Sequence, residues 1–283
     1  MSRAITGVDH VLVGVRDLEA ARLAYRRLGF TVSSRGRHVG WGTANYCLMF
    51  PANYVELLGI VDPAQSTNKL DEFLKTREGV MGVAFACDDA AAAAKALRGA
   101  GIDAEGPKEL KRVLEAAEGE SAPAFKLVDL PAAATPGAPA FLCQHLSRPL
   151  VWQAPWLEHA NGARGLVSVT GVVGDPGALA LAYGGLFGFD KVRVSDGFVE
   201  VATGGAVLRF TTPDWLGRLY PGLAGLPAYP VPWLAGLRLA VRDLAWTAAL
   251  LESAGTPYFR DGDRLLRLPP QAACGVLLEF AAG

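Results

Sequence analysis

Apolar runs of strand length alternate with helical patterns along the whole chain. The first run, VDHVLVGV at residues 8–15, is rich in β-branched residues and predicts a strand. Asp17 follows it as a helix N-cap, and Gly29 ends the predicted helix. The apolar residues between these two positions recur at helical spacing and predict one buried face; they are Leu18, Ala21, Tyr25 and Leu28.

Three further strands follow this helix. They are predicted at residues 30–37 (FTVSSRGR), 42–50 (GTANYCLMF) and 53–61 (NYVELLGIV), with a tight turn around residues 51–53. The first 61 residues therefore predict a β-α-β-β-β module.

This module recurs. VGVRDL at residues 13–18 matches LAVRDL at 239–244, and residues 82–101 share the pattern of residues 236–255. Each copy has an apolar strand, an acidic helix start, an Ala- and Leu-rich helix and a closing glycine. The sequence predicts four copies, which start near Ile5, Gly79, Gly165 and Leu234.

The spacing of the copies predicts an α+β fold with two domains, residues 1–150 and 164–283. Residues 146–164 lack periodicity and are predicted to link the two halves. Residues 212–234, rich in Pro, Gly, Leu and aromatic residues, are predicted to form a second connector.

Composition and charge narrow the class of protein. Hydrophobic residues make up 51% and charged residues 19% of the 283 residues, with a net charge of −1. Such a chain buries a core and has no basic field for nucleic acid or anionic lipid, so neither partner is expected. No apolar run is long enough to span a membrane. The four cysteines are isolated, which favours a cytoplasmic protein with reduced thiols.

Three segments of the first copy resemble the vicinal oxygen chelate superfamily, which includes glyoxalases, bleomycin-resistance proteins and extradiol dioxygenases. They are DHVLVGVRDLEAARLAYRRLGF (9–30), RHVGWGTANYCLMF (37–50) and YVELLG (54–59). The resemblance implies that the four βαβββ modules pair into two cup-shaped half-barrel sheets with helices outside. It also implies a divalent metal in a cup, held from the first and last strands of a module, here by His10 and Glu56.

The residue chemistry agrees with this implication. His10 and Glu56 each interrupt an apolar strand, and a buried carboxylate costs several kcal/mol unless it is paired or binds a metal. An imidazole and a carboxylate together suit Fe, Zn, Mn or Ni. A buried His–Glu hydrogen bond without metal, or a glutamate on an exposed strand face, are the alternatives.

A third ligand is expected from the last strand of the second copy. His145 is the preferred candidate there, and Gln144 is the other polar residue. A shift of one residue in register would exchange their faces. A glyoxalase with four ligands has a histidine where this chain has Gly82, so His10, Glu56 and His145 would form a two-histidine, one-carboxylate face.

Further candidate residues lie around a glycine- and arginine-rich segment between two strands. His38 is a candidate acid–base group, and Arg35 or Arg37 would hold an anionic or carbonyl substrate. Asn45 would donate a hydrogen bond to the substrate. A hairpin loop with solvated arginines is the alternative interpretation. Three aromatic residues are also expected to line the cup: Trp41, Tyr46 and Tyr54.

The second half is expected to be a degenerate cup. Ser168 and Gly236 take the place of His10, and Arg209 takes the place of Glu56 in the third copy. Glu279 matches Glu56 in the fourth copy. We expect it to be a structural carboxylate that is paired with an arginine, either Arg238 or Arg209.

These observations favour a metal-dependent lyase or isomerase that acts on a small molecule with vicinal oxygens. The metal would stabilise an enolate, and Glu56 or His38 would move the proton. A ring-cleaving extradiol dioxygenase and a non-enzymatic binding protein of the bleomycin-resistance type are the alternatives. A homodimer also stays open, although two pairs of modules can complete the cups within one chain.

Overall fold

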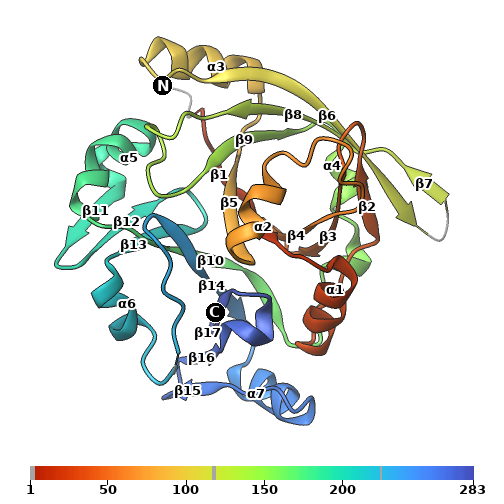
Figure 1. Ribbon diagram of the computed structural model, residues 1–283, viewed down its shortest axis with the longest axis vertical. Coiled ribbons are helices and arrows are strands. Elements are labelled where there is room, and N and C mark those ends of the chain that lie inside the picture. The colour runs from red at the N-terminus through yellow and green to blue at the C-terminus, as the bar shows by residue number, and fades with distance from the viewer. Residues whose placement is uncertain (1–3, 117–118, 224) are drawn as a thin grey trace.

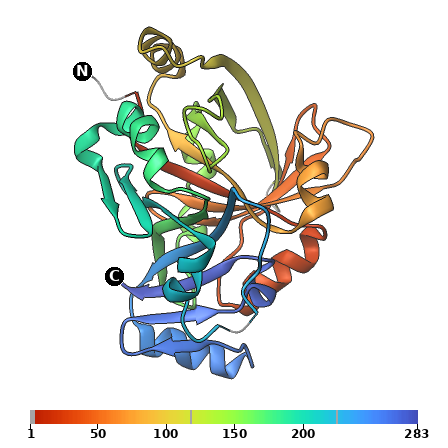
Figure 2. The same ribbon diagram turned by 60° about the vertical axis from the view of Figure 1, so that its left-hand side comes forward.

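The computed structural model describes residues 4–116, 119–223 and 225–283. In this part of the chain, two mixed sheets lie side by side, and the longer helices cover their outer faces (Figures 1 and 2). The predicted α+β fold of four paired βαβββ modules is confirmed. No helix in the described ranges has the length and apolar character needed to cross a membrane.

The first sheet contains the first two modules. The first module consists of β1 (Gly7–Gly14), α1 (Leu18–Arg27), β2 (Arg35–His38), β3 (Thr43–Met49) and β4 (Tyr54–Ile60). After α2 (Leu70–Thr76), the second consists of β5 (Gly79–Ala86), α3 (Ala90–Gly99), β6 (Glu105–Ala116), β7 (Gly119–Ser121), β8 (Ala124–Asp129) and β9 (Ala140–His145). The strand order is β2-β3-β4-β1-β5-β9-β8-β6-β7. An additional pairing of β2 with β6 closes this sheet into a barrel.

The second sheet contains the other two modules. Its third module consists of β10 (Ala163–Val172), α5 (Ala180–Phe187), β11 (Val192–Ser195), β12 (Phe198–Ala202) and β13 (Val207–Thr211). The fourth consists of β14 (Trp233–Val241), α7 (Leu244–Ser253), β15 (Phe259–Asp261), β16 (Leu265–Leu268) and β17 (Leu277–Ala282). The order is β11-β12-β13-β10-β14-β17-β16-β15, with no pairing between the two outer strands among the described residues.

Aspartate caps begin three of the module helices. The Asp17 carboxylate accepts a hydrogen bond from the Ala20 backbone N–H at the start of α1. Asp89 and Asp243 cap α3 and α7 in the same way. Each cap satisfies backbone donors that the first helical turn leaves free. Gly29 follows α1 with a φ of 85°, a conformation that glycine adopts at low cost.

The connectors hold more structure than the sequence pattern predicts. Residues 146–164 include α4 (Arg148–Val151) and a 3-10 turn at Ala154–Trp156, and residues 212–234 include α6 (Pro213–Leu219). The predicted strand at residues 30–37 is shorter, because Thr31 bonds to the first connector instead of a strand. Its backbone N–H donates to His159 Nδ1 at 3.0 Å, and its hydroxyl donates to the Glu158 carbonyl.

One hydrophobic core runs through both halves of the molecule. The buried cluster includes Val11 of β1 and Phe85 of β5 together with Leu208 of β13 and Phe280 of β17. The Tyr25 hydroxyl of α1 donates to the Ala273 carbonyl at 3.1 Å, which ties the first half to the last module. The two sheets therefore stabilise each other.

The registers of β1, β10 and β14, the first strands of three modules, agree with the alignment of these modules. Leu12 of β1 lies opposite Glu56, and the corresponding pairs are Thr170 with Arg209 and Arg238 with Glu279. Position 56 of the first module is thus equivalent to positions 209 and 279.

Arginines neutralise the equivalent carboxylate of the last module. The Glu279 carboxylate accepts from Arg238 Nε and from Arg267 Nε, each at 2.8 Å. The expected pairing with Arg238 is confirmed. Arg209 pairs with Glu200 instead, so Arg267 is the second partner of Glu279.

We expect Glu279→Gln to lower the free energy of unfolding by about 3–5 kcal/mol, because it leaves the buried Arg267 guanidinium without its inner carboxylate. Urea denaturation followed by circular dichroism measures this change. A loss below about 1 kcal/mol, which is typical of a surface ion pair, would contradict the structural role of Glu279.

Candidate functional site

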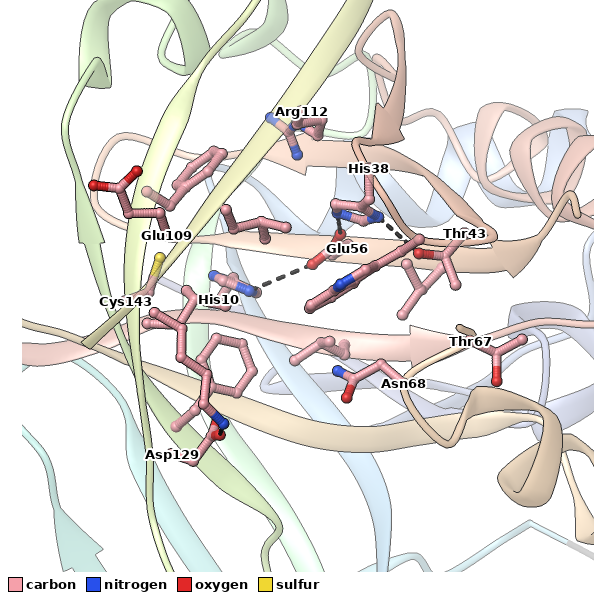
Figure 3. A pocket seen from close by; sticks show the side chains of 18 of the residues that line it. His10, His38, Thr43, Glu56, Thr67, Asn68, Glu109, Arg112, Asp129 and Cys143 are labelled. Atoms are coloured by element: carbon pink, nitrogen blue, oxygen red, sulfur yellow. Dashed lines mark hydrogen bonds and ion pairs between the residues drawn. The ribbon is translucent and has the colours of Figure 1, made fainter. Parts of the chain in front are cut away.

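The barrel of the first half encloses a cavity of about 150 Å³. An engineered cavity of about this volume holds a benzene molecule, so there is room for a small ligand. Polar side chains converge on it from several strands (Figure 3). The residues that matter below are His10 of β1, His38 of β2, Trp41, Tyr54 and Glu56 of β4, and Arg112 of β6.

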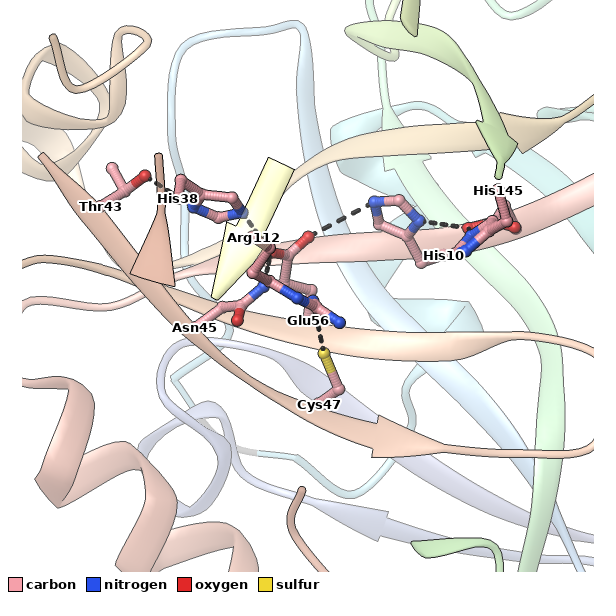
Figure 4. Close-up of polar contacts among 9 residues, drawn as sticks. His10, His38, Thr43, Asn45, Cys47, Glu56, Arg112 and His145 are labelled. Atoms are coloured by element: carbon pink, nitrogen blue, oxygen red, sulfur yellow. Dashed lines mark hydrogen bonds and ion pairs between the residues drawn. The ribbon is translucent and has the colours of Figure 1, made fainter. Parts of the chain in front are cut away.

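His10 lies between two carboxylates. Its Nδ1 is 2.6 Å from Asp9 Oδ1, and its Nε2 is 3.4 Å from Glu56 Oε2 (Figure 4). The imidazole stacks on the Tyr54 ring at a centroid distance of 4.4 Å. These contacts fix the plane of the ring and direct Nε2 toward Glu56.

Asp9 determines which nitrogen of His10 carries a proton. Burial alone raises the pKa of Asp9, but hydrogen bonds from His10 and His145 outweigh it and hold that pKa below its usual value. The ionised carboxylate only accepts hydrogen bonds, so His10 Nδ1 donates to it. Nε2 then needs a proton or a metal ion between it and the Glu56 carboxylate, since otherwise two lone pairs would face each other.

Glu56 is the acid at the centre of the site, and the residue is 5% exposed. Burial raises its pKa, while electrostatic interactions with His10, His38 and Arg112 and a hydrogen bond from Asn45 have the opposite and larger combined effect, so its pKa lies below the usual value. Asn45 Nδ2 donates a hydrogen bond to Oε1. The carboxylate is therefore oriented from one side and approached by imidazoles from two others.

His38 faces the same carboxylate from β2. Its Nε2 is 3.6 Å from Glu56 Oε1, and its Nδ1 is 2.9 Å from the Thr43 hydroxyl. Burial lowers the pKa of His38 to about 4, assisted by the nearby Arg112 and opposed by Glu56. The ring is thus neutral at pH 7.

The structure places His145 on the other side of His10. Its Nε2 is 3.0 Å from Asp9 Oδ1, so it contacts the carboxylate behind His10 and not Glu56. The register explains this position. Phe141 lies opposite Ala84 on β5 as Glu56 lies opposite Leu12 on β1, so Phe141 occupies the position equivalent to Glu56.

The other predicted residues divide between the cavity and its outside. Trp41 lines the cavity with its ring 5.7 Å from that of His38, and Tyr54 forms part of the wall. Asn45 is buried against Glu56. Arg37 points outward, because it precedes the inward-facing His38 on the same strand; it is 48% exposed and lies 3.8 Å from Glu115.

A second set of donors lies behind His10. Among the described residues, Asp9, His10 and Cys143 bring one potential ligand atom each to within 4.8 Å of one another. Burial raises the pKa of the Cys143 thiol well above its usual value, which keeps it protonated. His10 is therefore shared between this set and the Glu56 site.

Sequence reasoning did not identify Arg112, Asp9 or Thr43. Asp9 had a local signal, because it precedes His10 directly. Arg112 had none, since it reaches the cavity through the closure of the barrel, where His38 of β2 pairs with Arg112 of β6. That long-range pairing leaves no trace in the spacing of a single sequence.

Gly36 makes room for this arrangement on β2. A Cβ at this position would lie 2.5 Å from Arg112 Cδ and still closer to Asn45 Oδ1. The absence of a side chain thus allows Asn45 to reach Glu56 and Arg112 to cross the strand.

Comparisons with known proteins agree with this architecture. The model of a family described as glyoxalase-like domain matches residues 8–187. No curated protein matches the chain significantly.

Solved structures that share its fold include the following three. A hypothetical protein from Staphylococcus aureus is 14% identical with a TM-score of 0.70, covering 98% of this chain and 99% of that one. A variant of 4-hydroxymandelate synthase from Streptomyces coelicolor is 16% identical with a TM-score of 0.60, covering 98% and 92%. A xylose isomerase-like TIM barrel/4-hydroxyphenylpyruvate dioxygenase fusion protein is 14% identical with a TM-score of 0.58, covering 99% of this chain and 49% of its own.

We expect Gly36→Ala to lower the free energy of unfolding by about 1–3 kcal/mol, because the added methyl group overpacks Asn45 and Arg112. Gly99→Ala is the matched control, since a Cβ on this last residue of α3 meets no atom within 4 Å. Chemical denaturation of both variants measures the difference. Equal stability of the two variants would contradict the packing described here.

Proposed function

Because the chain belongs to the glyoxalase-like domain family, we propose that it is a divalent-metal-dependent enzyme of the lyase or isomerase type. Its substrate would be a small molecule with two neighbouring oxygen atoms. The observation that carries the proposal is the buried Glu56 carboxylate, which faces the nitrogens of His10 and His38 across gaps of 3.4 and 3.6 Å.

These gaps fit two ligands of one ion better than they fit hydrogen bonds. A good N–H···O hydrogen bond spans about 2.7–3.2 Å. Two ligands that each lie about 2.1 Å from one tetrahedral ion are separated by about 3.4 Å. His10 Nε2 and Glu56 Oε2 have this separation, so these two residues would hold the ion.

Asp9 completes the arrangement from behind. Metal-binding histidines commonly donate their other ring N–H to a carboxylate, which fixes the tautomer. Asp9 accepts from His10 Nδ1 at 2.6 Å and provides this support. The set of Asp9, His10 and Cys143 fits an ion less well, because the Asp9–His10 contact is itself a hydrogen bond.

A bound divalent cation would stabilise negative charge on a substrate oxygen as a Lewis acid. His38 would accept the proton at Nε2, since its ring is neutral and faces the cavity. The Thr43 hydroxyl holds His38 Nδ1 in place, and Asn45 holds the Glu56 carboxylate. Trp41 and Phe125 contribute apolar surface that excludes water from the reacting atoms.

One observation favours a second candidate function, a ring-cleaving dioxygenase. His10, His38 and Glu56 supply two imidazoles and one carboxylate on one side of the cavity, the residue set of many non-haem Fe(II) oxygenases. In that case His38 would be a third ligand instead of a base.

We expect His10→Ala to lose at least about nine-tenths of its bound metal, because it removes one of two protein ligands and the group that Asp9 orients. Elemental analysis after growth with added Zn²⁺ or Mn²⁺ measures the stoichiometry, and circular dichroism verifies the fold. His145→Ala and Cys143→Ser are the matched controls and should keep the metal. Full metal content in a folded His10→Ala protein, or its loss only in Cys143→Ser, would overturn the assignment.

We expect His38→Gln to keep its metal within about twofold of wild type, because the base hypothesis does not require His38 as a ligand. The same elemental analysis measures it. Loss of the metal in a folded protein would contradict the base role and favour the dioxygenase arrangement, for which O₂ consumption by the Fe(II)-loaded wild type is the direct measurement.

A further inference from the structure

Arg112 is a buried cation that forms no direct ion pair among the described residues, although the more distant Glu56 carboxylate raises its pKa. The residue is 3% exposed, and its single side-chain hydrogen bond runs from Nη1 to the Cys47 thiol at 3.5 Å. Its Nε is buried without any hydrogen-bond partner. In the described ranges, no carboxylate oxygen lies within 4.0 Å of a guanidinium nitrogen of Arg112, which is the distance that defines an ion pair. Burial of a charge in this state is costly unless a further group completes the site.

Other buried arginines of this chain have partners. Arg267 forms ion pairs with Glu279 and Asp261, each at 2.8 Å. Arg77 donates to the Val80 carbonyl at 2.9 Å and more weakly to that of Glu78. Burial of an arginine is thus compensated elsewhere in the fold, and Arg112 is the exception that lines the cavity.

The position of Arg112 suits a ligand in that cavity. The guanidinium lies over the Phe125 ring at 5.6 Å and shares the cavity with His38 and Glu56 (Figure 3). Lys108 also lines the cavity, but it is exposed and pairs with Asp129 at 2.5 Å. Arg112 is therefore the buried, unpaired cation among the described lining residues.

The chemistry of the guanidinium favours a carboxylate as its partner. Its planar donor fork matches the two oxygens of a carboxylate, and a singly charged anion compensates its single positive charge. The second contact of this anion rests on the proposed function, in which His10 and Glu56 would hold a divalent ion.

We propose that the cavity binds a small organic acid, whose carboxylate contacts Arg112 while its neighbouring oxygen faces His10 and Glu56. The substrate class is then a carboxylic acid with an oxygen on the adjacent carbon, and Arg112 is the residue that selects it.

The test compares an acid with its uncharged amide. Mandelate and mandelamide share a ring and a vicinal hydroxyl and differ in the charge that Arg112 would recognise. Isothermal titration of the metal-loaded and the metal-free wild type should show at least about tenfold tighter binding of the acid, since hydrogen bonds to charged groups are worth about 1.5–3 kcal/mol. We expect Arg112→Gln to bring the acid-to-amide ratio close to one.

Two further variants serve as controls for this comparison. Arg37→Gln removes an arginine from the neighbouring strand that points away from the cavity, so it should keep the preference. Arg112→Lys keeps the charge without the fork and should retain part of it. If Arg112→Gln does not fold, the acid-to-amide ratios of the wild type and of Arg112→Lys are compared. A smaller ratio in Arg112→Lys supports the inference, and an equal ratio contradicts it.

Equal or absent binding of both probes by the wild type, or a preference that survives Arg112→Gln, would overturn the inference. A preference for the acid in a protein that binds no metal would leave the inference standing while the proposed function fails. Bound metal without any preference for the acid would overturn the inference and leave the proposed function standing.

Discussion

The burial of one carboxylate is the constraint on which the first half depends. Glu56 lies on a strand whose neighbours are apolar and fully buried, and a carboxylate pays several kcal/mol for this position unless its surroundings compensate. The compensation comes from parts of the chain that lie far apart in sequence. Asn45 comes from the adjacent strand, His10 from β1, and His38 and Arg112 from the two strands whose pairing closes the barrel. The strand pairing that closes the sheet therefore also brings two of the groups that stabilise the Glu56 carboxylate.

The second half shows a different solution at an equivalent position. Glu279 occupies the same register as Glu56, but two arginines donate hydrogen bonds to it. Its carboxylate is therefore paired directly, whereas that of Glu56 faces the cavity. At the place of His10 stands Gly236, where a Cβ would lie 2.6 Å from the Tyr220 hydroxyl. That hydroxyl donates a hydrogen bond to the Thr170 hydroxyl at 3.1 Å, so the space beside Gly236 is occupied by Tyr220. A module can thus keep its fold while its carboxylate changes from an available group into a structural one.

The sequence predicts the local features of this structure and few of its long-range contacts. Asp17 as a helix cap and the repeat of the module follow from patterns a few residues long, and both are confirmed. That His10 and Glu56 face one cavity follows from strand periodicity and the register of adjacent strands. The position of His145 depends on the register of β9 against β5, which a single sequence does not determine, and the structure places Phe141 where a ligand was sought. Arg112 was missed because the pairing of β2 with β6 links residues 74 positions apart, His38 and Arg112.

The second half of the chain also contributes to the site, together with the segment that joins the two sheets. The strands β3 and β4, which carry Asn45 and Glu56, meet at a turn that this segment fixes from outside. The Trp152 indole N–H donates to the Phe50 carbonyl at 2.9 Å, and His159 Nε2 donates to that of Met49 at 2.8 Å. At the start of the second sheet, the Leu166 backbone N–H donates to Asn53 Oδ1 at 3.0 Å. Because ligand geometry tolerates errors of only about 0.5 Å, a turn that is held from outside keeps Asn45 and Glu56 in the positions that the site requires.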